Sequence, residues 1–333
     1  MTLEENGQVH AENFTNLGLP TTFVKATQSP LGATLLFNLV DINDYNERKI
    51  KDLIKKQAVY YHLDMQFVAT KEAHFGMFVK IKQAKLFLSK LLYDVDLQKM
   101  IIGKDADDKD VEIDFDKTPH LLIAGTTGSG KTILLKNLIL NIYGVYAKKR
   151  RPFVLDMLDT KFELQRFASM KNAYFYGENA RTQGDNIFTA LEKACERMDA
   201  IYTGKLPNTY EHFIIIDELA DLMLTTELRG QVEDMIVRLA SKGRACGIHL
   251  IIATQSPRVA VISGLIKANM PNRIALKTAS IRESCIVLEH KGAEALEGSG
   301  DAIFKVGLEE RHIQIAYPEE DLIKGVIKLN MRR

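Results

Sequence analysis

Residues 120–140, HLLIAGTTGSGKTILLKNLIL, join two apolar segments of different period through a glycine-rich turn. The first segment is a short continuous apolar run that predicts a buried strand, and the second repeats its apolar residues with helical spacing. Between them, Gly125, four further residues and then Gly130-Lys131-Thr132 match the phosphate-loop pattern. A strand before the loop and a helix after it are the context that this pattern requires.

The glycines of this loop allow the backbone to curl so that its N–H groups face phosphates at a helix N-terminus. Lys131 is expected to reach the β- and γ-phosphates, and Thr132 to ligate magnesium. The predicted cofactors are therefore ATP and Mg²⁺, and the alternative is a glycine-rich turn without a ligand. The predicted nucleotide-binding residues are Gly125, Thr126, Thr127, Gly128, Ser129, Gly130, Lys131 and Thr132.

A second apolar run, FIIIDE at residues 213–218, ends in two acidic residues. Asp217 would lie at the carboxyl end of a buried strand, where open parallel sheets bind ligands, and would hold magnesium together with Thr132. Glu218 is suited to orient or deprotonate the attacking water. The alternative is an N-cap pair for the helix that follows.

A third apolar run, HLIIATQSP at residues 249–257, also ends in polar residues. Gln255 is positioned to sense the γ-phosphate from that end. The alternative is a strand that simply ends before a turn at Pro257.

Strand-like runs alternate with helical patterns from residue 120 onward, which predicts an α/β fold with a mainly parallel sheet covered on both faces. Upstream, a strand at 32–41, a helix at 46–63 and a strand at 75–82 predict a smaller α/β domain. The expected organisation is a flexible N-terminus at 1–20, the small domain at 21–90 and an ATPase domain at 91–333.

Composition gives few further indications about function. The 44 Lys and Arg residues and 43 Asp and Glu residues leave a formal net charge of +1, so a surface that binds nucleic acid must be local. The three cysteines are widely spaced and form no Cys-x-x-Cys pair, as in a reduced cytosolic chain. No segment is apolar enough for a membrane span, so we expect a cytoplasmic protein that reaches a membrane only through a partner.

The motifs in order resemble the motor domain of the FtsK/SpoIIIE family of DNA translocases. Besides the phosphate loop, the segments that carry the resemblance are FIIIDELADLM, RLASKGRACGIHLIIATQSP, VISGLIKANMPNRIAL and GAEALEGSGDAIF. The resemblance implies a RecA-like P-loop NTPase that assembles as a hexameric ring around double-stranded DNA. Such a ring moves along DNA by ATP hydrolysis through sequence-independent backbone contacts.

Residue roles follow from the resemblance where the motifs match. Lys131 and Thr132 would bind nucleotide and magnesium, and Asp217 and Glu218 would serve the metal and the water, with Gln255 as sensor. Arg244, in KGRACGIH, is the candidate for a finger that reaches the γ-phosphate in the neighbouring subunit, and the alternative is a helix-terminal arginine that caps carbonyls or lies in solvent.

The chain also departs from the family pattern. Asp159-Thr160-Lys161 resembles the family's Asp-Pro-Lys segment but lacks the proline. Cys285 stands where the family usually has an arginine that bridges subunits, and Arg282 is a candidate substitute.

The expected function is that of a compact DNA motor of a mobile genetic element, active in DNA transfer such as conjugation or in maintenance, because the winged-helix domain and membrane segments of chromosomal members are missing. A membrane or relaxase protein would be a partner. The alternatives are a protein-secretion ATPase and a nucleotide-gated assembly factor without catalysis, and DNA-stimulated hydrolysis would distinguish them.

Overall fold

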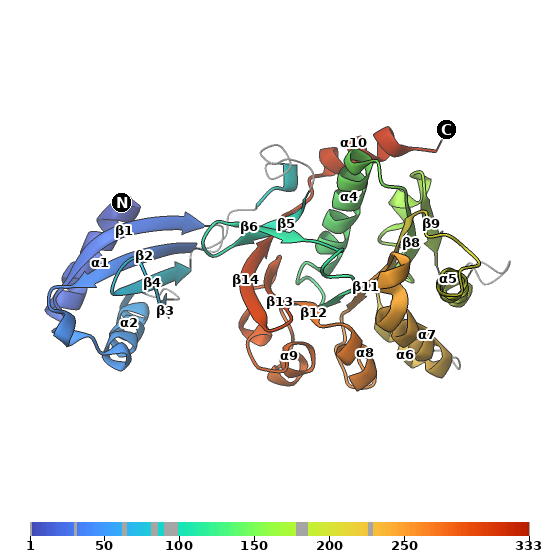
Figure 1. The fold of residues 1–333 in the computed structure, drawn as a ribbon. Helices are drawn as coiled ribbons and strands as arrows, with labels where there is room; N and C mark the ends of the chain where they lie inside the picture. The colour runs from blue at the N-terminus through green and yellow to red at the C-terminus, as the bar shows by residue number, and fades with distance from the viewer. Residues whose placement is uncertain are drawn as a thin grey trace. The chain divides into compact units, whose positions relative to one another are not determined.

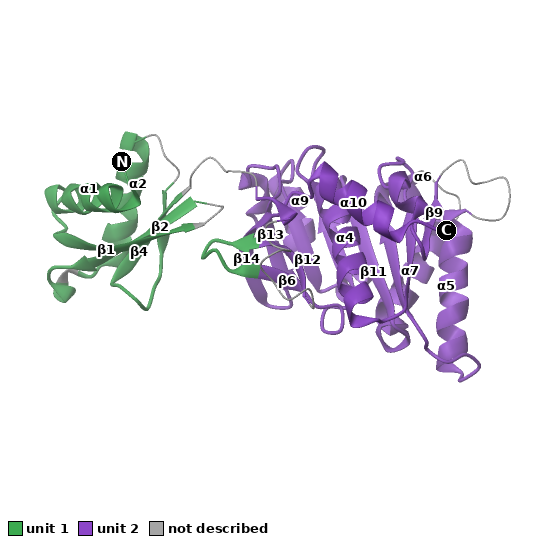
Figure 2. Ribbon diagram, turned by 90° about the horizontal axis from the view of Figure 1, so that it is seen from above, with its two compact units in different colours: residues 1–85, 104–110 green, residues 86–103, 111–333 purple. Residues whose placement is uncertain are grey.

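The computed structural model describes residues 2–29, 32–61, 65–80, 86–89, 99–177, 186–225 and 229–332. Contacts between residues divide the chain into two units, which Figure 2 shows in different colours. The smaller unit comprises residues 1–85 and 104–110, and the larger unit comprises residues 86–103 and 111–333. Within the described ranges, no helix is long and apolar enough to cross a bilayer.

The smaller unit is a four-stranded antiparallel sheet with two helices packed on one face. The strand order is β1-β2-β4-β3. Alternate residues of β2, including Leu35 and Phe37, share one core with Phe14 of α1 and Ile50 of α2. The elements are α1 (Leu3–Asn16), β1 (Thr21–Ser29), β2 (Gly32–Leu39), α2 (Glu47–Tyr61), β3 (Met65–Val68) and β4 (Phe75–Lys80). The last two residues of the strand expected at 75–82 lie outside the described residues.

Most of the segment expected to be a flexible N-terminus at residues 1–20 forms helix α1 in the structure. Its first turn is closed by a capping box, in which the Thr2 hydroxyl accepts a hydrogen bond from the Glu5 amide and the Glu5 carboxylate accepts one from the Thr2 amide. Phe14 is completely buried and packs edge-on against two phenylalanines of the sheet. Packing of one helix face therefore stabilises a segment whose polar composition indicated little structure.

The larger unit is built on a ten-stranded sheet of order β6-β5-β14-β13-β12-β7-β11-β10-β8-β9. The strands from β12 to β9 in this order are parallel, whereas β13 is antiparallel to both of its neighbours, β12 and β14. The predicted α/β fold with a mainly parallel sheet is confirmed. The strands are β5 (Met100–Asp105), β6 (Asp110–Ile113), β7 (Leu121–Ala124), β8 (Phe153–Leu158), β9 (Ala173–Tyr176), β10 (Glu211–Ile216), β11 (Ile248–Thr254), β12 (Asn272–Leu276), β13 (Asp301–Val306) and β14 (Glu309–Ile315).

Helices cover both faces of this sheet (Figure 1). In β7, Leu121 and Ile123 face the core that contains α4 and α10, and Leu122 and Ala124 face the core built by α5 to α9. Burial on both faces is the reason why these strands read as continuous apolar runs. The helices are α4 (Lys131–Lys149), α5 (Ile187–Tyr202), α6 (Leu219–Thr225), α7 (Arg229–Lys242), α8 (Gly264–Asn269), α9 (Ile281–Leu288) and α10 (Glu320–Asn330).

The parallel pairing brings the carboxyl ends of four strands together. Strand β11 pairs with β7 on one side and β10 on the other, and β10 pairs with β8. The loops that follow these strands meet at one edge of the sheet, where open parallel sheets bind ligands.

Candidate nucleotide site

The phosphate loop has the backbone that its glycines were expected to allow. Gly128 and Gly130 have left-handed φ angles of 79° and 112°. A Cβ atom on Gly130 would lie 2.8 Å from the amide nitrogen of Gly300, whose N–H donates to the Ser129 carbonyl. Helix α4 starts at Lys131 after a glycine N-cap that contributes no capping side chain, so its first-turn N–H groups are available to an anion.

Lys131 forms a buried ion pair with Asp217. Its ammonium donates to the Asp217 Oδ1 atom at 2.8 Å and to the Asp217 carbonyl oxygen at 2.5 Å, and the two side chains are 3% and 0% exposed. Burial raises the pKa of Asp217, while the charge and hydrogen bond of Lys131 act in the opposite direction.

The second carboxylate oxygen of Asp217, Oδ2, is buried and has no hydrogen-bond partner in the described part of the chain. This oxygen and the Thr132 hydroxyl are oxygen ligands of the kind that magnesium prefers. The residues at this position therefore fit a hard divalent cation next to a phosphate.

Glu218 is held by groups from two segments, the carboxyl end of β11 and the loop after β8. Its carboxylate accepts hydrogen bonds from the Thr254 hydroxyl at 2.7 Å and from the Gln255 amide at 3.1 Å, and pairs with the Lys161 ammonium at 3.0 Å. Burial alone would raise the pKa of Glu218, but the hydrogen bonds from Thr254 and Lys161 and the charges of Lys131 and Lys161 bring it below its usual range. The side chain is thus kept ionised, as a proton acceptor must be.

The acidic pair also takes part in a helix start, as the alternative interpretation required. Glu218 accepts a hydrogen bond of 3.3 Å from the Ala220 amide in the first turn of α6. An N-cap, however, needs no ammonium partner, and both acidic residues pair with a lysine. The pairs with Lys131 and Lys161 favour a charged binding site over a cap alone.

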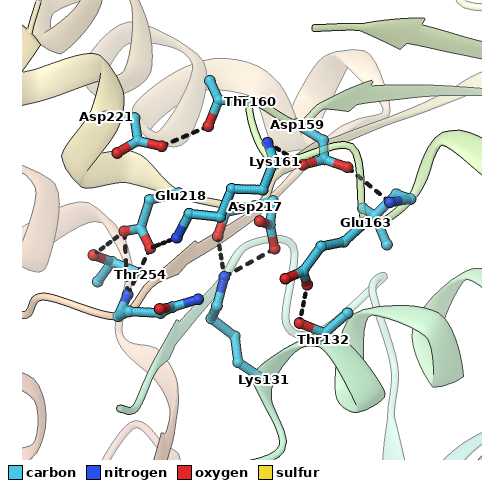
Figure 3. A network of polar contacts seen from close by, with 12 residues as sticks. Lys131, Thr132, Asp159, Thr160, Lys161, Glu163, Asp217, Glu218, Asp221 and Thr254 are labelled. Atoms are coloured by element: carbon cyan, nitrogen blue, oxygen red, sulfur yellow. Dashed lines mark hydrogen bonds and ion pairs between the residues drawn. The ribbon is translucent and has the colours of Figure 1, made fainter. Parts of the chain in front are cut away.

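The segment after β8 contacts both Glu218 and the phosphate loop (Figure 3). The Asp159 carboxylate accepts hydrogen bonds from the backbone amides of Lys161 and Leu164 and so shapes the turn. Lys161 then reaches Glu218, and Glu163 accepts a hydrogen bond from the Thr132 hydroxyl. Sequence reasoning singled out Asp159-Thr160-Lys161 only through its resemblance to the family segment.

Glu163 and Thr254 were missed. The usable signal was their position, since both are polar residues at or just beyond the carboxyl end of a strand in the same sheet. Gln255 was predicted as a sensor and lies beside the phosphate loop, where its side-chain oxygen accepts a hydrogen bond of 2.8 Å from the Thr127 hydroxyl.

Arg244 is not brought to this site within the chain. It lies in the short 3₁₀ turn Gly243–Cys246 at the amino end of β11, whereas the phosphate loop follows the carboxyl end of β7, which is parallel to β11. The Arg244 guanidinium is exposed and donates to the Asp116 carbonyl at 2.9 Å. Cys285 is exposed on α9, and Arg282 lines a cavity of about 650 Å³.

Comparisons with known proteins identify the family of this chain. The FtsK/SpoIIIE family model matches residues 93–209 and 208–259. The DNA translocase FtsK of Leptospira interrogans is 37% identical in an alignment 255 residues long, which covers 69% of this chain and 26% of that protein. The DNA translocase FtsK of Haemophilus influenzae is 34% identical in an alignment 242 residues long, which covers 61% of this chain and 45% of that protein. The chain thus spans less than half the length of these relatives.

Two solved structures share the fold. The pCW3 conjugation coupling protein TcpA, in a monomer form with ATPγS, has a TM-score of 0.64 at 21% identity and covers 97% of this chain and 99% of its own. The cytoplasmic domain of the Type VII secretion ATPase EccC of Thermomonospora curvata has a TM-score of 0.63 at 23% identity and covers 75% of this chain and 35% of its own.

Proposed function

The chain belongs to the FtsK/SpoIIIE family, and from this premise we propose that it is an ATP-hydrolysing motor that moves along double-stranded DNA. The observation that carries the proposal is a set of two ion pairs beside a glycine-rich phosphate loop, the buried pair of Lys131 with Asp217 and the pair of exposed Lys161 with buried Glu218. This set provides a phosphate clamp, a place for a metal and an ionised base at one sheet edge.

The side chains divide the chemistry between them. An ammonium group has three donors, and Lys131 uses two on Asp217 within the described chain, which leaves one for a phosphate oxygen. Thr132 and Asp217 would hold magnesium, which when bound neutralises charge on the β- and γ-phosphates.

Glu218 would take the proton of the attacking water. Four protein donors already occupy the roughly four lone-pair sites of its two oxygens, so a water would take the place of one of them. Gln255 joins the loop and the base, because its side chain contacts Thr127 and its amide donates to Glu218. That double contact supports a sensor role for Gln255.

A DNA-contacting surface is proposed at the cavity beside α9. Its charged lining consists of three arginines, Arg229, Arg258 and Arg282, and one acidic residue, Glu283. Neither Arg258 nor Arg282 makes a side-chain hydrogen bond or ion pair with the residues that the structure describes. Guanidinium groups bind phosphate oxygens strongly, and three around one hollow concentrate positive charge on a chain whose net charge is only +1.

One comparison supports an assignment of the biological process. TcpA, a conjugation coupling protein, matches nearly the full length of this chain, which supports DNA transfer by a mobile element. The family supports assembly as a hexameric ring. We place the motor in the cytoplasm, with a membrane or relaxase protein as recruiting partner.

The test is ATP hydrolysis measured with and without double-stranded DNA. Duplexes of different sequence should stimulate hydrolysis equally, and binding should weaken steeply with salt because phosphate contacts release counterions. Changing both Arg258 and Arg282 to Gln should reduce the slope of log affinity against log salt by about two. Arg238→Gln, which removes an exposed arginine paired with Asp199, serves as the control. ATP hydrolysis that double-stranded DNA does not stimulate would instead favour a secretion ATPase. A chain that does not hydrolyse ATP would favour an assembly factor.

A further inference from the structure

Glu163 is the acceptor for the hydroxyl proton of Thr132. The two residues are 31 positions apart in the chain, Thr132 in the first turn of α4 and Glu163 in the loop after β8 (Figure 3). Thr132 is the residue of the phosphate loop that would ligate magnesium. Whatever binds its proton therefore decides which way its lone pairs face.

A hydroxyl has one proton and two lone pairs. When the proton is committed to Glu163, both lone pairs of Thr132 remain for a cation. Asp217 does not take this proton, because its Oδ1 atom accepts from Lys131 and its Oδ2 atom has no partner among the described residues. The orienting contact thus comes from Glu163 and leaves Asp217 Oδ2 for the cation.

The chain holds Glu163 in place by contacts on both sides of it. Leu164, the next residue, is completely buried and its amide donates to Asp159 at 2.7 Å, while Lys161 is anchored on Glu218. Phe162, between them, has a left-handed φ of 61°, which a bulky residue rarely adopts. This turn allows Lys161 and Glu163 to reach different partners, the base on one side and the phosphate loop on the other.

We propose that Glu163 is a positioning residue for the magnesium site and acts through the Thr132 hydroxyl. The inference rests on the proposed ATPase function. Glu163 would not itself ligate the metal, because it orients the Thr132 hydroxyl that does. Groups that orient metal ligands typically change metal affinity about 10- to 100-fold when they are removed.

The experiment measures Mn²⁺ affinity of the ADP-loaded protein by electron paramagnetic resonance, and ADP affinity in EDTA by fluorescence. Glu163→Ala should weaken Mn²⁺ binding about 10-fold or more. ADP affinity in EDTA should stay at the wild-type level, which also shows that the variant is folded. Glu163→Gln keeps an acceptor oxygen for the Thr132 proton and should retain most of the Mn²⁺ affinity. Glu192→Ala, an exposed position on α5, is the control.

A double-mutant cycle tests the route of action. In a Thr132→Ala background, Glu163→Ala should have no further effect on Mn²⁺ binding. An additive effect there, or unchanged Mn²⁺ affinity in Glu163→Ala alone, would overturn the inference. Equal losses of ADP binding with and without metal would overturn it as well, because they would show a structural role. A wild-type chain that binds neither ADP nor Mn²⁺ would overturn the proposed function itself.

Discussion

The candidate site contains two lysine–carboxylate pairs of different burial. Lys131 and Asp217 are both nearly inaccessible, whereas Lys161 is 35% exposed and Glu218 is 3% exposed. Removing one partner of a buried pair leaves a charge without compensation and typically costs about 3–5 kcal/mol. The two pairs also differ in their role in the proposal, because Lys131 would bind phosphate and Lys161 would control the charge of the base.

We expect mutations to separate nucleotide binding by Lys131 from hydrolysis by Glu218. Lys131→Ala should abolish nucleotide binding because it removes the phosphate donor. Glu218→Gln should bind nucleotide but not turn it over, because an amide accepts no proton from water. Fluorescent-nucleotide binding and phosphate release measure the two steps. Turnover of Glu218→Gln at the wild-type rate would remove Glu218 from the base role.

Lys161 should control the pH dependence of hydrolysis. The pKa of Glu218 lies below its usual range, in part because of the Lys161 ammonium, so the wild-type base stays ionised as the pH falls toward that range. In Lys161→Met, the Lys161 charge and hydrogen bond no longer lower the pKa of Glu218, so burial raises it. The acid limb of the kcat profile should therefore move to higher pH, with exposed Lys205→Met as control. Superimposable profiles for Lys161→Met and wild type would contradict this.

Helix α1 is the element whose stability depends most clearly on tertiary contacts. Its only strong local signal is the Thr2–Glu5 capping box, and its apolar contacts converge on Phe14. A helix of this length and polarity is marginal in water without a partner surface. The sheet of the smaller unit provides that surface.

Phe14→Ala should destabilise the smaller unit by about 3–5 kcal/mol, the usual loss for a fully buried phenylalanine. Amide hydrogen exchange in β1 and β2 would measure the change locally, so that the larger unit does not mask it. Glu12→Ala, on the exposed side of the same helix, is the matched control. Equal protection in both variants would mean that α1 does not contribute to this core.

At the scale of the whole molecule, Arg244 lies at the amino ends of the parallel strands and the phosphate loop at their carboxyl ends. An arginine finger at Arg244 can then act only on the nucleotide of another subunit. A guanidinium supplied in trans can raise turnover about 10³- to 10⁵-fold.

Mixing Arg244→Ala subunits with Lys131→Ala subunits tests this arrangement. Each variant should be inactive alone. Mixed rings contain interfaces where an intact nucleotide site faces an intact Arg244, so DNA-stimulated hydrolysis should partly return. The finger role fails if activity stays at zero at every ratio although mixed rings form, or if Arg244→Ala alone keeps wild-type turnover.

Local patterns in the sequence determined the parallel core and the phosphate loop. Burial on both faces forces continuous apolar runs, and the left-handed backbone at Gly128 and Gly130 favours glycine. Residues that are neighbours in the sequence therefore carry both signals. The position of Asp217 and Glu218 at a strand end was predictable for the same reason. The antiparallel end of the sheet and helix α1 carried weaker local signals.

Only the tertiary structure decided which side chains meet. The contacts of Glu163 with Thr132 and of Thr254 with Glu218 join residues 31 and 36 positions apart. They depend on the order in which β7, β11, β10 and β8 lie side by side, and strand order is set by how helices pack on the sheet. Periodicity records which face of a strand is buried, but it holds no information about which strand lies next to it.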